Sequence, residues 1–305
     1  MTPPSKSRLL KRIAIGAVLL LAAILLLGLA LARSVPSPND EIAKLKAAGL
    51  PVSTLDLNSY YPPIPAESNA ALLVIEAAAE FSTPSMELRG MVLPKGGEKV
   101  SPDLSRAIAG HIATNSTSLQ ILSKAARLQL SRYPIVFASN IPPAFPHLAD
   151  VKNLVQLFSY EAAYHASRGE SSSAFHSITN GFSVSATLRD EPFLISRLVY
   201  IACVAINVSS IETLLAHVPL SDAELQILSG ELRRVEADFS VYGPRALISE
   251  RAVGIDNFNT IAQAGQGSAN PTQVLQGSFY RFLGFHDRDL RLYLEFMEGL
   301  IDARR

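Results

Sequence analysis

Residues 198–206 read LVYIACVAI, and this apolar stretch decides the fold. Because it has no polar face, it predicts a helix that is buried on every side at the centre of a helical domain. Arg197 precedes the stretch and Asn207 follows it, so it is too short to cross a bilayer. Cys203 lies within it and is predicted to be a core residue.

On both sides of this stretch the sequence has the spacing of amphipathic helices. Apolar residues recur every three or four positions, and caps mark helix starts at Ser101-Pro102 and in the Ser221–Glu224 capping box. No run shows the alternation of a β-strand. The sequence therefore predicts an all-α domain built as an array of antiparallel helical hairpins. The predicted helices cover 40–48, 69–81, 102–126, 148–168, 171–189, 192–217, 221–239, 244–258 and 290–301.

Three segments between the predicted helices are rich in Pro or Gly. Residues 82–100 are predicted to be a loop, and residues 262–278, which have little charge, a mobile loop. Residues 131–147 contain four prolines but also Tyr133 and Phe137, so they are too apolar for a linker and should pack on the helices.

Residues 154–186, LVQLFSYEAAYHASRGESSSAFHSITNGFSVSA, resemble one tetratricopeptide-type helical hairpin. Small or turn residues stand where that family requires helices to approach closely, at Ala162, Gly169, Ala174 and Gly181. The resemblance implies a helix–turn–helix with its turn at Gly169. No second copy follows at a 34-residue period, whereas a repeat fold needs about three units. A generic antiparallel helix pair explains the segment equally well.

The N-terminal region contains a second apolar run, residues 13–32, which has 20 residues and no charge. A helix of that length spans about 30 Å, the thickness of the hydrocarbon core of a bilayer. We predict a transmembrane anchor. A cleaved signal peptide is the alternative, because Ala30-Leu31-Ala32 fits a cleavage site, although the run is longer than the usual apolar core of a signal peptide.

Charge sets the predicted orientation. Four cations lie before the run (Lys6, Arg8, Lys11 and Arg12) and only Arg33 closely follows it, so the N-terminus is predicted to be cytoplasmic and the bulk of the chain periplasmic or extracellular. Residues 1–33 hold five cations and no acid, which leaves 22 cations against 27 acids and a net charge of −5 on the exported part. This charge argues against a nucleic-acid partner.

The whole layout is similar to that of uncharacterised, membrane-anchored or exported bacterial α-helical proteins. The similarity rests on the anchor, the Asn69-Ala70-Ala71 helix start, the Gly-centred hairpin and the buried apolar helix. It implies a fold and not a reaction. The predicted organisation is a cytoplasmic N-terminus (1–12), a transmembrane helix or signal peptide (13–32), a stalk with a Pro-rich segment (33–66) and an α-helical extracytoplasmic domain (67–305).

The sequence contains few candidate catalytic or metal-binding groups. It has no G-x-S-x-G, Ser-x-x-Lys, His-Glu-x-x-His or phosphate-loop motif, so we assign no catalytic or cofactor-binding residue and expect no cofactor. The best constellation for a metal is Glu161 and His165, one helical turn apart, with His176 on the next helix. These residues are candidate zinc ligands, and the alternative is that all three are ordinary polar residues.

A second polar cluster lies in PRALISERAVGIDNF, residues 244–258, where Glu250 and Arg251 indicate an internal ion-pair network. Arg291 and Glu295 are predicted to form an exposed i, i+4 ion pair on the last helix. With no catalytic motif, the leading hypothesis is a membrane-anchored interaction or scaffold module with a protein partner. The alternatives are an envelope hydrolase or metal-dependent enzyme, and a small-ligand sensor with its pocket beside residues 198–206.

Overall fold

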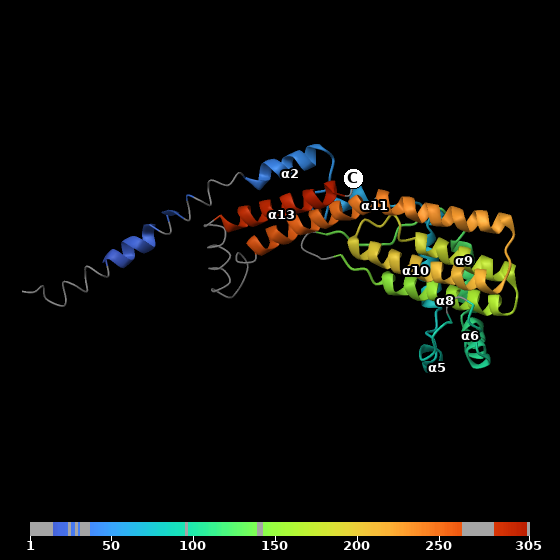
Figure 1. The fold of residues 1–305 in the computed structure, drawn as a ribbon. Coiled ribbons are helices and arrows are strands. Elements are labelled where there is room, and N and C mark those ends of the chain that lie inside the picture. The colour runs from blue at the N-terminus through green and yellow to red at the C-terminus, as the bar shows by residue number, and fades with distance from the viewer. Residues whose placement is uncertain are drawn as a thin grey trace, which may run out of the picture. The chain divides into compact units, whose positions relative to one another are not determined.

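The computed structural model describes residues 15–23, 26, 27, 30, 37–94, 97–138, 143–263 and 284–303. Every regular element named among these residues is a helix (Figure 1). An isolated β-bridge joins Asn69 to Leu130, and the described residues contain no strand. The all-α prediction is therefore confirmed for this part of the chain.

The helices vary in length from a single turn to 42 residues. They are α2 (Pro38–Ala47), α3 (Leu57–Tyr60), a 3₁₀ turn (Ala66–Ser68), α4 (Ala70–Ala79), α5 (Met86–Arg89), α6 (Pro102–Thr114), α7 (Ser116–Ala125), α8 (His147–Ser167), α9 (Ser171–Ala186), α10 (Leu194–His217), α11 (Asp222–Gln263) and α13 (Phe285–Asp302).

The chain divides into two compact units. Unit 1 consists of Met1–Ser53 and Arg251–Leu300, and unit 2 consists of Thr54–Glu250 and Ile301–Arg305. Unit 1 therefore contains α2, the C-terminal part of α11 and nearly all of α13. Unit 2 contains α3 to α10 and the N-terminal part of α11.

In unit 2, α8, α9 and α10 pack against one another, and Figure 1 shows them side by side. α8 and α9 are joined at Gly169, whose φ of 75° lies in the left-handed region that glycine adopts without steric cost. α9 and α10 lie close together at Gly181, where a Cβ would overlap the amide oxygen of Asn207. The side-chain amide of Asn207 in turn donates to Ser185 Oγ on α9 at 2.9 Å.

α10 contains the LVYIACVAI stretch, and its prediction is only partly right. Tyr200 and Cys203 are buried, but Leu198 is 54% exposed and Ile201 40% exposed. The buried side chains lie on one side of α10, so complete burial was a wrong expectation. The LVYIACVAI stretch therefore has one buried face and one apolar face that the described residues do not cover.

Among the described residues, only α10 is long and apolar enough to cross a membrane, and it lies mid-chain rather than at the N-terminus. In its most apolar window 44% of the residues are buried inside the protein, and core helices pass the same test of length and composition. Its buried Arg197 donates to the backbone oxygen of Asp238 at 2.5 Å, and Tyr200 donates to the Asp238 carboxylate at 2.8 Å. These polar contacts within unit 2 are those of a core helix.

The structure differs from the sequence prediction at two helix boundaries. Asn115 divides the helix predicted over 102–126 into α6 and α7, because its buried side chain accepts from Ser82 N at 2.7 Å and donates to Ser82 O at 3.1 Å. In contrast, Pro244 does not divide α11, which was predicted as two helices. Residues 82–100, predicted to be a loop, contain the short helix α5.

Residues 131–138 and 143–147, the described part of the Pro-rich segment, pack on unit 2 as predicted. Tyr133, Ile135 and Phe137 are buried, whereas Pro134 and Val136 are exposed, which is the alternation of an extended chain. Asn69 Oδ1 accepts from the amide of Arg132 at 2.9 Å and also caps α4 by accepting from Ala71 N at 3.1 Å. The Asn69 side chain therefore both caps α4 and binds the extended segment.

Unit 1 has its own small apolar core. It is formed by side chains from α2, the end of α11 and α13, with two residues that follow α2. α11 and α13 approach closely at Gly254, where a Cβ would overlap the ring and hydroxyl of Tyr293. The core residues are Leu45, Val52, Ile255, Leu290 and Leu294, with Ile42, Leu50, Phe258 and Tyr293 packed around them.

The predicted anchor over residues 13–32 is described only in part. Residues 15–23, 26, 27 and 30 are helical and exposed, and Leu21, for example, is 65% exposed. The other residues of the run lie outside the described residues, as do residues 1–12 and 264–278 of the predicted mobile loop.

Candidate binding site

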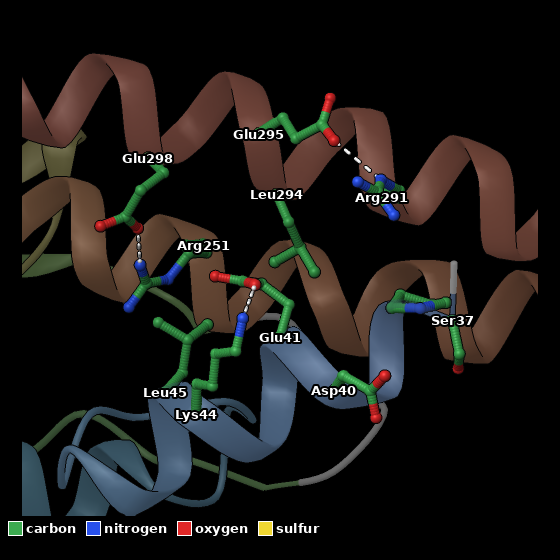
Figure 2. A pocket seen from close by; sticks show the side chains of 11 residues that line it. Ser37, Asp40, Glu41, Lys44, Leu45, Arg251, Arg291, Leu294, Glu295 and Glu298 are labelled. Atoms are coloured by element: carbon green, nitrogen blue, oxygen red, sulfur yellow. Dashed lines mark hydrogen bonds and ion pairs between the residues drawn. The ribbon is translucent and has the colours of Figure 1, made fainter. Parts of the chain in front are cut away.

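A cavity of about 470 Å³ lies within unit 1, between α2, α11 and α13 (Figure 2). Its walls combine apolar side chains at Pro38, Leu45 and Leu294 with charged side chains from all three helices. Cavities of a few hundred cubic ångströms are typical of sites for small molecules or single side chains. The charged lining residues are Asp40, Glu41, Lys44, Arg251, Arg291, Glu295 and Glu298.

Local sequence rules place the α2 wall. Ser37 caps the helix by accepting from Asn39 N at 3.2 Å, and Pro38 occupies the first turn, where its missing N–H costs nothing. Asp40 and Glu41 follow in the same turn, where a carboxylate is stabilised by the helix dipole. Leu45 faces the core, so the acids and Lys44 are left on the more open side of the helix.

Three ion pairs line the cavity, and Figure 2 shows each of them. Arg251 Nη1 lies 2.6 Å from Glu298 Oε2, Arg291 Nε lies 2.7 Å from Glu295 Oε1, and Lys44 Nζ lies 3.4 Å from Glu41 Oε2. The Arg251 side chain is only 1% exposed, whereas Glu298 is 37% exposed. Arg251 is therefore the fixed charge of the site, and the other members of these pairs can move into solvent.

The lining has an excess of acid. It holds four carboxylates and three cations, and Asp40 makes no ion pair with any residue that the structure describes. Exposed ion pairs contribute at most about 1 kcal/mol each, so a ligand's own charges can replace them at little cost. The arrangement is suited to recognising a group that carries positive charge next to an apolar part.

The predicted metal ligands belong to unit 2, whereas the residues that line the cavity belong to unit 1. Glu161 Oε2 accepts from Ser177 Oγ at 2.8 Å, and burial raises the pKa of Glu161, an effect that this hydrogen bond and His165 oppose. His165 Nδ1 lies 2.6 Å from Glu170 Oε2, and His176 is exposed on α9. In the described part of the chain, no three His, Cys, Asp or Glu side chains group in a way that could hold a metal ion.

Other polar residues of unit 2 form buried structural contacts. His147 Nε2 lies 2.9 Å from Glu191 Oε2, the Glu191 carboxylate also accepts from Ser196 Oγ, and Tyr133 stacks on the His147 ring with centroids 3.9 Å apart. All four side chains are buried. This buried polar network ties the Pro-rich segment to α8 and α10.

The sequence identified part of the unit 1 site. The Arg291–Glu295 pair was predicted and is present, because both residues lie one turn apart on α13. Arg251 was predicted to be in an internal ion-pair network, and its partner Glu298 was missed because the two residues are 47 positions apart. Glu250 accepts from Leu194 N at 3.1 Å. No sequence signal joins α2 to these residues.

Comparison with known proteins gives no further guide to this site: no protein-family model, no curated protein and no solved structure matches the sequence.

Proposed function

We propose that the chain is a membrane-anchored helical interaction module that holds a segment of a partner protein in the cavity of unit 1. The observation that carries this proposal is the cavity itself, about 470 Å³ in volume, with an apolar wall and an excess of carboxylates. In this proposal residues 13–32 anchor the chain, residues 1–12 lie in the cytoplasm and residues 33–305 lie outside it. The apolar run and the four cations before it support that topology.

The lining chemistry defines the expected partner. A basic side chain of the partner would pair with Asp40 and with the acids released from Lys44 and Arg291, while an adjacent apolar side chain would contact Leu45 and Leu294. A carboxylate in the bound segment would find the buried Arg251 guanidinium. The partner segment is thus expected to contain at least one Lys or Arg beside an apolar residue.

Site-specific photocrosslinking in native membranes tests the proposal. A photoreactive amino acid replaces Lys44, which lines the cavity with a 74% exposed side chain, and a control chain carries it at Met86, which is 81% exposed in unit 2. We expect a crosslinked partner from position 44 but not from position 86, and its yield should fall when Asp40→Asn is added. Equal products at both positions, or a crosslinked segment without a basic residue, would contradict the proposal.

The anchor is tested in the same cells. Mass spectrometry of the N-terminal peptide distinguishes an intact chain from one cleaved after residue 32, and protease added outside the inner membrane should digest unit 2 but not residues 1–12. An intact chain that is fully protected from that protease would reverse the proposed orientation.

A further inference from the structure

α13 has two apolar faces, and in the part of unit 1 that the structure describes only one of them packs into the core. Leu290, Leu294 and Met297 are buried in or beside the core. On another side of the same helix, Leu292 is 53%, Phe296 64% and Leu300 38% exposed. Because these three residues are spaced by four positions, they form a single stripe along the helix. We call Leu292, Phe296 and Leu300 the outer stripe.

The outer stripe differs in polarity from the neighbouring face of α13. The adjacent face of α13, which contains Arg291, Glu295 and Glu298, is charged and lines the cavity. Isolated apolar residues on a surface need no explanation, but three large side chains in register on one helix indicate a surface that is covered by something apolar.

The length of the chain limits what can cover it. The predicted anchor ends at Ala32 and α2 begins at Pro38, so at most about 20 Å of extended chain separates them. α2 and α13 share the core of unit 1 through Leu45 and Leu294. α13 is therefore held close to the bilayer surface if residues 13–32 span it.

We infer that the outer stripe of α13 lies in the interfacial region of the bilayer that anchors the chain. The inference rests on the proposed anchor. Three apolar side chains alone bind a bilayer weakly, but a short tether makes the contact intramolecular and raises the effective concentration of lipid at the stripe. The acids on α13 disfavour an anionic surface, so the occupant is a zwitterionic headgroup layer.

The test uses the absence of tryptophan from the sequence, which makes any introduced Trp the only one. The full chain carrying Phe296→Trp is reconstituted in zwitterionic vesicles with or without lipids brominated high on the acyl chain, which quench Trp on contact. The matched control is Glu295→Trp, one residue away on the charged face and 57% exposed. We expect blue-shifted emission and severalfold stronger quenching for position 296 than for position 295.

The possible outcomes separate the inference from the proposed function. If the full chain does not float with vesicles, the proposal that residues 13–32 anchor it in a membrane is wrong. Flotation with equal quenching at positions 295 and 296 would leave the anchor and overturn the outer-stripe contact. A third outcome is blue-shifted emission from position 296 without quenching by bromine, where the blue shift disappears when each nanodisc holds one chain. That outcome would show that the outer stripe contacts a second copy of the protein, and it would also overturn the inference. Circular dichroism of both variants verifies that the helices are intact.

Discussion

Units 1 and 2 place their polar side chains differently. In unit 2, buried groups such as Asn115, Asn207 and Glu191 bond to residues on other elements, and their loss would leave polar atoms without partners in the core. In unit 1 the core cluster is apolar, and apart from Arg251 the charged residues of the cavity are half-buried or exposed. Buried polar contacts favour one arrangement of helices, whereas exposed charges remain able to bind a partner.

The largest effect is expected in the buried polar network of unit 2. Glu191→Ala removes the acceptor of both His147 and Ser196 in a site where the Glu191 side chain is 0% exposed. We expect a loss of about 3–5 kcal/mol in the free energy of unfolding, because buried partners are left unpaired. Cys203 reports this loss, since burial raises the pKa of its thiol to about 12 and it reacts with maleimide only when unit 2 opens.

Two controls accompany this variant. Glu76→Ala removes an exposed carboxylate from α4 and should leave the labelling rate of Cys203 unchanged. Labelling of the Glu191→Ala chain at the parent's rate would show that the network does not stabilise unit 2.

A smaller effect is expected from the close approach of helices in unit 1. Gly254→Ala places a Cβ against the Tyr293 ring, so we expect a loss of about 1–3 kcal/mol despite the better helix propensity of alanine. The matched control is Gly230→Ala in α11, where no atom lies within 4 Å of the new Cβ and a gain of up to about 1 kcal/mol is expected.

Hydrogen exchange read by mass spectrometry measures this change. Amides of α2 should exchange faster in Gly254→Ala, while Cys203 labelling stays at the parent's rate. If Cys203 labelling rises as much as α2 exchange, the two units unfold together and the comparison between them fails.

The sequence predicted what depends on neighbours along the chain. The Asn69 cap, the Ser101 cap and the reciprocal Ser221–Glu224 capping box are all present, with Ser221 N donating to Glu224 Oε2 at 2.8 Å. It missed the break at Asn115 because the partner of that amide, Ser82, is 33 residues away. Contacts between distant segments also form the cavity of unit 1, so of its three ion pairs only Arg291–Glu295 was predicted with both partners.

The third prediction concerns Glu161, where the expected change in stability is smaller than at Gly254. Because burial raises its pKa, the folded state favours the protonated carboxyl, and this contribution to stability is lost as pH rises through the raised pKa. Glu161→Gln stays neutral at every pH and can still accept from Ser177. We therefore expect the variant to be slightly more stable than the parent at pH 7 and equally stable below the ordinary glutamate pKa.

Urea unfolding at several pH values measures this difference, and the exposed Glu76→Gln should show none. The same experiment tests the predicted metal site of Glu161, His165 and His176. If a chelator destabilises the parent but not Glu161→Gln, these three residues hold a metal ion. Burial of the Glu161 carboxyl would then not explain the stability difference.

The smallest effect on stability is expected at the rim of the cavity, where it matters most for the proposed function. Arg291 and Glu295 are 36% and 57% exposed, so a double-mutant cycle with alanine should give a coupling of at most about 0.5 kcal/mol. If the pair served stability, the coupling would be larger and partner binding would not depend on it. We expect the reverse: Glu295→Ala should lower the crosslinking yield from position 44 while unfolding stays close to that of the parent. Charged residues of a binding surface are expected to contribute little to folding and much to partner binding. A coupling between Arg291 and Glu295 above about 1 kcal/mol, with an unchanged crosslinking yield, would instead assign the pair to the fold of unit 1.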